Sequence, residues 1–257
     1  MLSIPDTTDL PGRSGRLGCA TMRPRPRLPR LLLLGLAGLA LSVGPAGCGS
    51  SSSGDGLASG PPVEVIAHAK AAAGSASSVY ISGTLVSEGV PVSLEMELLA
   101  GKGGRGRVAQ NGLSFELVQV GGIVYLDGSP AFDRHIGGSA AVQLLRGRWL
   151  KAPAGTPELA PIAALTDLHE LIDSALAGSG PLTSGGITTL HGQKAVAIDD
   201  ISKGETVYVA ATGKPYPLEV VKDDGRGGTV VFERWNEPVT LVAPADALDV
   251  TKLQSAH

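Results

Sequence analysis

The residues best suited to chemistry in this sequence gather around His169. Asp167, Glu170 and Asp173 lie close to it, and carboxylates beside an imidazole are the groups used by metal sites and acid–base catalysts. On a helix, however, these side chains point in different directions, which indicates a solvated face. None of the five His has another His four residues away. We therefore expect no metal site.

Two further patterns imitate catalytic motifs. Glu95 and Glu97 lie on one face of a predicted strand and could act as paired carboxylates. Their spacing is better explained by the solvent-exposed face of an amphipathic strand. Residues 101–106 match the letters of a dinucleotide-binding loop. That loop works only between a strand and a helix, whereas another strand follows here. The serine-hydrolase pattern Gly-x-Ser-x-Gly is missing from the sequence. We therefore expect neither catalysis nor a cofactor.

The most informative reactive group is the thiol of Cys48. It follows a basic stretch at residues 23–30 and a 13-residue apolar run at residues 31–43. About 20 apolar residues are needed to span a bilayer, so this order is typical of a secretory signal peptide. Residues 46–48 resemble a bacterial lipobox, whose Cys is acylated, although Pro45 stands where an aliphatic residue is usual. An ordinary signal peptide with an incidental Cys is the alternative.

The N-terminal composition predicts the domain boundaries. Residues 1–21 add nothing to a signal, and Met22 directly precedes the basic stretch, so Met22 is the expected start of translation. A Gly/Ser-rich tract after Cys48 is typical of a flexible tether. The expected parts are an over-called start plus signal peptide (1–47), a tether (48–62), a folded domain (63–250) and a C-terminal tail (251–257).

The distribution of charge argues against nucleic-acid binding. Residues 1–47 contain six Arg and two Asp, whereas residues 48–257 contain 15 basic and 22 acidic residues. The one basic cluster after Cys48 consists of Lys102, Arg105 and Arg107. It could contact anionic lipid headgroups, or it could simply solubilise a hairpin and protect a sheet edge.

Alternating apolar and polar residues predict a sheet-rich domain. Residues 92–98 alternate strictly, and Asn111-Gly112 is a strong hairpin signal between two such runs. Helical spacing appears at residues 63–76, 131–145 and 160–177. We predict an α+β fold in which one large curved antiparallel sheet of about ten strands forms a half-barrel, with the helices on its concave face. Residues 239–242 are expected to form its last strand.

Several short segments carry a family resemblance. They are Val-Tyr-Leu (124–126), Arg-Trp-Leu-Lys (148–151), Val-Tyr-Val (207–209), Gly-Lys-Pro-Tyr-Pro (213–217) and Val-Phe-Glu-Arg-Trp-Asn-Glu-Pro-Val (231–239). With the lipobox-like Cys48 and its tether, they make the chain resemble the actinobacterial LppX/LprG-type lipoprotein family. The fold of that family is similar to the LolA/LolB lipoprotein carriers. The resemblance implies a half-barrel that encloses a cavity for the acyl chains of envelope lipids or lipoglycans.

The resemblance and the alternation together predict a lining for this cavity. The candidates are Ile81, Val92, Leu94, Met96, Leu98, Phe115, Leu117, Leu168, Leu171 and Ile172. The same residues would equally fill a closed core. Trp149 and Trp235 could surround a lipid entrance or pack as ordinary core residues.

The expected function is therefore that of an exported, monomeric lipoprotein that binds or transfers lipids or glycolipids across the cell envelope. A diacylglyceryl group on Cys48, with palmitate as a typical acyl chain, would anchor it to the outward face of the cell membrane. The alternative is a non-catalytic structural or interaction lipoprotein with a filled core. An envelope enzyme that uses His169 or Glu95 is least favoured.

Overall fold

The computed structural model describes residues 59–254, apart from residues 88, 179 and 224–226. The chain divides into two compact units, Met1–Cys48 and Gly49–His257, and every described residue belongs to the second. The expected signal peptide, Cys48 and most of the expected tether therefore lie outside the described residues.

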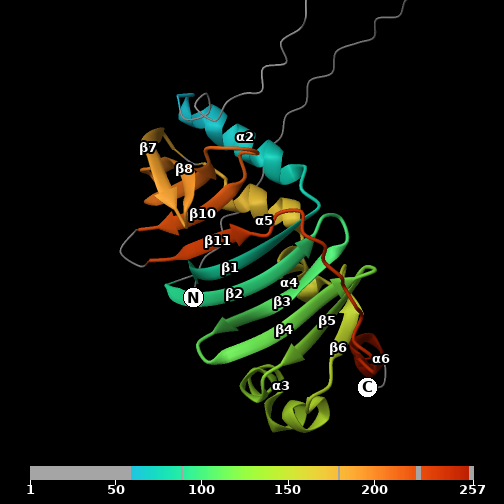
Figure 1. Cartoon of the computed structure of the whole chain (residues 1–257). Coiled ribbons are helices and arrows are strands. Elements are labelled where there is room, and N and C mark those ends of the chain that lie inside the picture. Colours follow the sequence, from blue (N-terminus) through green and yellow to red (C-terminus); the bar gives the residue numbers. More distant parts are fainter. Residues whose placement is uncertain (1–58, 88, 179, 224–226, 255–257) are drawn as a thin grey trace, which may run out of the picture. The chain divides into compact units, whose positions relative to one another are not determined.

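One open sheet dominates the second unit (Figure 1). Its spatial order is β12-β6-β5-β4-β3-β2-β1-β11-β10-β9-β8-β7. The strands are β1 (Ser78–Ser87), β2 (Val90–Leu99), β3 (Gly103–Gln110), β4 (Leu113–Val120), β5 (Ile123–Gly128), β6 (Leu150–Pro153), β7 (Leu182–Leu190), β8 (Gln193–Asp200), β9 (Glu205–Ala210), β10 (Pro217–Lys222), β11 (Thr229–Glu233) and β12 (Leu248–Asp249).

The predicted α+β class with a single large sheet is confirmed, with one correction. All neighbouring strands pair antiparallel except β12, which runs parallel to β6, so the sheet is mixed. The expected strand at residues 239–242 is wrong, because this segment is irregular and pairing resumes only at Leu248. Pro238 and Pro244 flank the segment, and proline supplies no backbone donor for a strand ladder.

The tight turns follow directly from their residues. Asn111 and Gly112, between β3 and β4, have φ angles of 51° and 74°. A two-residue hairpin turn of this kind needs positive φ at both positions, which Asn and Gly tolerate best. The hairpin predicted from Asn-Gly is therefore confirmed.

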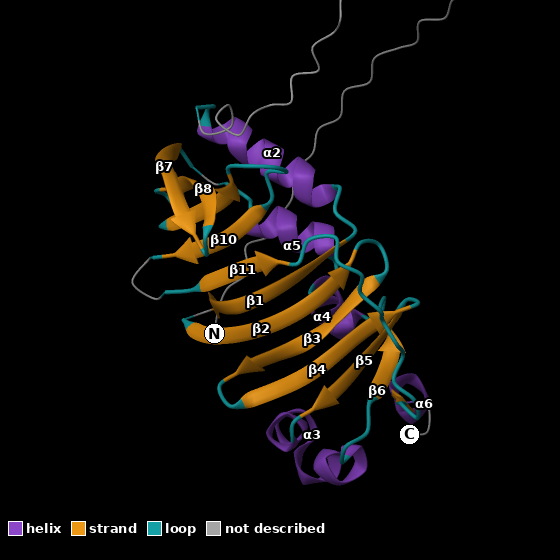
Figure 2. Cartoon of the chain, viewed as in Figure 1, coloured by secondary structure: helices purple, strands orange, loops and turns teal. Residues whose placement is uncertain are grey.

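Helices pack against one face of this sheet and at its ends (Figure 2). They are α2 (Pro62–Gly74), α3 (Pro130–Leu145), the 3-10 turn η1 (Pro157–Leu159), α4 (Ala160–Ala164), α5 (Leu168–Ala175) and α6 (Val250–Gln254). The single helix expected at residues 160–177 is instead broken in two. The break precedes Asp167, whose carboxylate accepts hydrogen bonds from the backbone N–H groups of His169 and Glu170 at 2.9 and 3.1 Å. This N-cap starts α5 anew.

The core lies between α2, α5 and the face of the sheet that we call the inner face. Val65, Ile66 and Ala69 of α2 are buried, as are Leu168 and Ile172 of α5. They belong to one cluster with the alternate residues of the strands. The expected position of these two helices against an apolar sheet face is thus observed.

Helix α3 differs from this expectation. It follows the end of β5, contacts β4 and β5, and packs Phe132 against Phe115 with ring centroids 5.2 Å apart. Its backbone is kinked at Gly137 and Gly138, and Ile136 and Leu144 are about half exposed. Because the kink divides it into short pieces, α3 presents no continuous apolar stripe that could cover the sheet.

Two glycines on the inner face of β3 make room for side chains of β2. A methyl group added at Gly104 would meet the Leu98 side chain, and one at Gly106 would overlap the Glu95 carbonyl oxygen and the Met96 sulfur. Leu98 and Met96 are 0% and 2% exposed. The glycines therefore permit two large side chains of the core to lie flat on the neighbouring strand.

We predict that Gly106→Ala lowers the free energy of unfolding by about 1–3 kcal/mol, the usual range for overpacking a core. Urea denaturation measures the change. Ala109→Val, on the opposite face of the same strand, serves as control and should alter stability by less than about 0.5 kcal/mol. An unchanged midpoint for Gly106→Ala would contradict the close packing of Met96.

Candidate functional site

Cross-strand pairing arranges the inner face in rows around the β1–β2 and β10–β11 pairs. The deep row contains Ile81, which is directly opposite both Met96 and Phe232. The next row contains Leu94, opposite Val108, and Val230, opposite Val220. All these side chains point to one face because paired residues share a face of the sheet.

The third row lies at the ends of the strands, and we call it the rim row. It includes Leu85 opposite Val92, and Glu205 opposite Lys222. Asp200 is opposite Glu205 on the other side. The inner face therefore changes along the strands from fully buried aliphatic residues to a partly exposed edge that also bears charges.

Helix α5 and the preceding Leu165 cover a cavity of about 400 Å³ above these rows. Of the fourteen residues that line it, twelve are apolar, and the two polar ones are Ser174 and Glu205. The apolar lining consists of Ile81, Leu85, Val92, Leu94, Met96, Val108, Leu165, Leu171, Ala175, Val220, Val230 and Phe232. This volume lies within the range of roughly 300–1,000 Å³ that is typical of small-molecule sites.

Five of the ten residues expected around a cavity line this one, namely Ile81, Val92, Leu94, Met96 and Leu171. Four others, Leu98, Leu117, Leu168 and Ile172, are at most 2% exposed and belong to the core. Phe115 packs against Phe132.

Sequence reasoning missed the contribution of the C-terminal strands. Val220, Val230 and Phe232 line the cavity because β11 pairs with β1, about 150 residues earlier in the chain. Their alternation was a signal for strands, but alternation alone does not state which strand is the neighbour. Glu205 was missed because nothing in the sequence distinguishes it from a solvated strand residue.

Among the described residues that line the cavity, Glu205 alone carries an ionisable group. Burial raises its pKa, and the Asp200 carboxylate raises it further, while the ammonium groups of Lys203 and Lys222 act in the opposite direction. Asp200 is itself held in a turn, where its Oδ1 accepts hydrogen bonds from the backbone N–H of Ser202 at 3.0 Å and of Lys203 at 3.3 Å.

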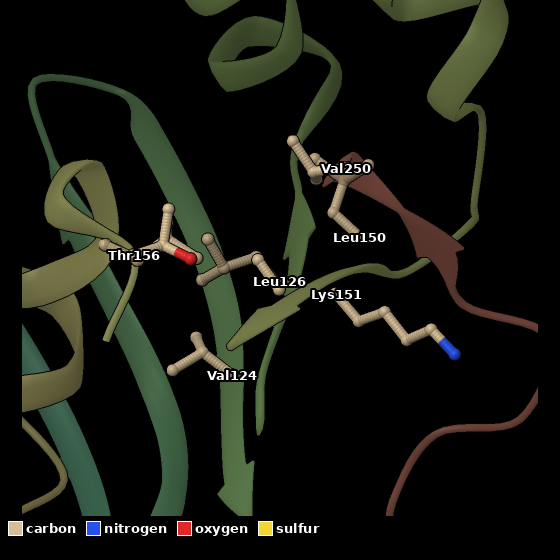
Figure 3. Close-up of a pocket in the computed structure, with 8 residues that line it drawn as sticks. Val124, Leu126, Leu150, Lys151, Thr156 and Val250 are labelled. Atoms are coloured by element: carbon tan, nitrogen blue, oxygen red, sulfur yellow. The ribbon is translucent and has the colours of Figure 1, made fainter. Parts of the chain in front are cut away.

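A second, smaller apolar pocket of about 90 Å³ lies at the β5–β6 end of the sheet (Figure 3). Val124, Leu126 and Leu150 line it from the strands, and Val250 of α6 lies beside it. In Figure 3 the Lys151 side chain points away from Val124 and Leu126. This pocket is far smaller than the cavity under α5, so we do not assign it a ligand.

The other residues that could perform chemistry have structural partners. His169 Nε2 donates to the carbonyl oxygen of Gly74 at 3.1 Å and so joins α5 to the end of α2. Asp167 caps its own helix. Within the part of the chain that the structure describes, no group of three or more His, Cys, Asp or Glu side chains could hold a metal ion.

The arginines of β3 pair with carboxylates of β2 and β4 on the outer face of the sheet. Arg105 Nε donates to Glu97 Oε2 at 2.6 Å, and Arg107 donates to Glu116 at 2.9 Å. Arg234 also approaches Glu97 at 3.2 Å. Two of the three residues of the expected basic cluster are therefore already neutralised by carboxylates.

The two tryptophans are not among the residues that line the cavity. Trp235 stacks on Tyr216 with centroids 4.7 Å apart, and its indole N–H donates to the Pro217 carbonyl oxygen at 3.2 Å. Trp149 borders an outer-face groove beside Tyr80 and Arg107. Neither lines the large cavity, and Trp235 packs against the core, which agrees with the second of the two roles considered for it.

No helix among residues 59–254, as far as they are described, is both long and apolar enough to cross a membrane. Neither a protein-family model nor a curated protein matches the sequence.

Several solved structures resemble the fold. LprF from Mycobacterium bovis is 15% identical, with a TM-score of 0.48 over 72% of this chain and 97% of that one. The lipoprotein LppX from Mycobacterium tuberculosis is 18% identical, with a TM-score of 0.46 over 70% and 98%. An uncharacterized conserved protein from Thermus thermophilus is 14% identical, with a TM-score of 0.37 over 73% and 96%. LppX bears the name of the lipoprotein family that the sequence resembles, and the likeness to these three structures is one of fold.

Proposed function

We propose that the chain is a non-catalytic, membrane-anchored lipoprotein that binds acyl-chain lipids or lipoglycans in the cavity under α5 and transfers them within the cell envelope. The observation that carries this proposal is the cavity of about 400 Å³, whose lining is apolar except for Ser174 and Glu205. A hydrocarbon chain is the ligand that such a lining solvates better than water does.

The binding free energy would come from removing apolar surface from water. Each methylene group buried contributes about 0.8 kcal/mol. A chain lying along the rows would contact Leu94 and Val230 in the middle and Ile81, Met96 and Phe232 at the deep end. No bond is made or broken in this mechanism, so it requires neither a cofactor nor a nucleophile.

The filled-core alternative, a structural or interaction lipoprotein, accounts less well for this geometry. A solid core would bring α5 onto the sheet, yet Leu94 and Val230 remain only partly buried beneath it. The proposal that Cys48 carries a diacylglyceryl anchor on the outward face of the membrane stands on the sequence pattern.

We predict that Val230→Phe weakens binding of a monoacylglycerol with a fluorescent acyl chain about tenfold. The added ring occupies space for roughly two methylene groups, which corresponds to about 1.6 kcal/mol. Val231→Phe, on the outer face of the same strand, is the matched control and should bind as the wild type does. Fluorescence titration measures both. Equal affinity for the two variants, with melting temperatures unchanged, would show that the cavity is not the binding site.

We predict that Cys48→Ala abolishes incorporation of labelled palmitate by the exported protein in the host that produces it. Thioether and amide acylation both require this residue, and no other Cys follows it in the sequence. Metabolic labelling measures acylation, and membrane fractionation then measures attachment of the protein to the membrane. Palmitate label that persists in the variant would place the lipid attachment elsewhere.

A further inference from the structure

The rim row places a carboxyl group at the edge of an apolar cavity. Glu205 shares its face of β9 with Val207 and Val209, which are 5% and 0% exposed, but it lies at the strand end, where it is half-buried. Among the described residues, none forms a hydrogen bond or ion pair with its carboxylate. A ligand in the cavity would thus find an acceptor group at this edge.

The charges around Glu205 are balanced. Asp200 and Lys222 lie opposite it on the two neighbouring strands, and Lys203 precedes it in the β8–β9 turn. These are the charged groups that act on its carboxyl. Lys203 also donates from its ammonium group to the carbonyl oxygen of Ala177, just beyond α5. Among the described residues, this edge therefore carries two carboxylates and two ammonium groups, and the ammonium group of Lys203 is already engaged by a carbonyl oxygen.

A free fatty acid would add a third anion at this edge. Its carboxylate would lie near Glu205 in a partly desolvated position, where like charges repel more strongly than in water. A hydroxyl group of an uncharged head would instead donate a hydrogen bond to the Glu205 carboxylate, and such charge-assisted bonds are stronger than neutral ones. Ser174, across the cavity on α5, offers a further hydroxyl partner.

We propose that Glu205 determines head-group specificity, so that the cavity accepts acyl lipids with an uncharged, hydroxyl-bearing head and disfavours free fatty acids. This inference rests on the proposed function, because it concerns a ligand in the same cavity. Glu205 acts as a binding group for the head, while the aliphatic rows hold the chain.

The test compares monopalmitoylglycerol with palmitic acid, which share one acyl chain, on the full-length protein at pH 8. We expect the wild type to prefer monopalmitoylglycerol roughly tenfold, the order of one like-charge repulsion at a partly solvated site. Glu205→Gln keeps the shape of the side chain but removes the charge, so the preference should fall below about threefold, mainly through tighter binding of palmitate. Isothermal titration calorimetry measures both affinities.

Two control variants separate specificity from structure. Glu205→Asp retains the charge and should retain the preference, whereas Glu233→Gln removes an exposed carboxylate on the outer face of β11 and should change neither affinity. An unchanged preference in Glu205→Gln, with both lipids still bound, would overturn this inference and leave the proposed function intact. Binding of neither lipid to the wild type would overturn the proposed function itself.

Discussion

The structure depends on one constraint, which is that the apolar face of a wide sheet must be removed from water. In the described part of the chain, twelve strands form this sheet, but the helices that pack on its inner face are short. Helix α2 contacts β7 to β10, and α5 packs between α2 and the centre of the sheet. Between α5 and the aliphatic rows of the sheet, the side chains leave a cavity. The cavity therefore exists because the helices cover less area than the apolar face of the sheet presents.

The polarity of the cavity wall also changes along the length of the strands. The paired residues of the deep row are at most 3% exposed. Gly104 and Gly106 let Leu98 and Met96 lie across β3. At the rim row the same faces carry Glu205, Lys222 and Asp200. An amphipathic ligand has the same polarity gradient, from an apolar tail to a polar head. The match between the two gradients connects the architecture with the proposed binding of lipids.

Local sequence patterns predicted the strands of the sheet. They could not predict the whole site, because the site depends on pairing between strands that are far apart in the sequence. The alternation at residues 92–98 and the Asn111-Gly112 turn specify β2 and the β3–β4 hairpin, because both signals act over a few residues. Leu94 and Leu98 show the limit, since both occupy the inner face of β2. Leu94 lines the cavity and Leu98 is fully buried, and alternation alone does not distinguish the two positions. Helix α3 was misplaced for a related reason, because its helical spacing did not reveal the kink at Gly137 and Gly138.

The most direct test of the account is to locate a bound acyl chain. Photocrosslinking with a monoacylglycerol that carries a diazirine near the end of its chain, followed by mass spectrometry of the peptides, provides that location. The account predicts that labels concentrate on β1, β2 and β11 around Ile81, Met96 and Phe232, and that unlabelled monoacylglycerol competes for them. Labels confined to outer-face residues such as Tyr80 and Val118, or labels that no competitor removes, would contradict it.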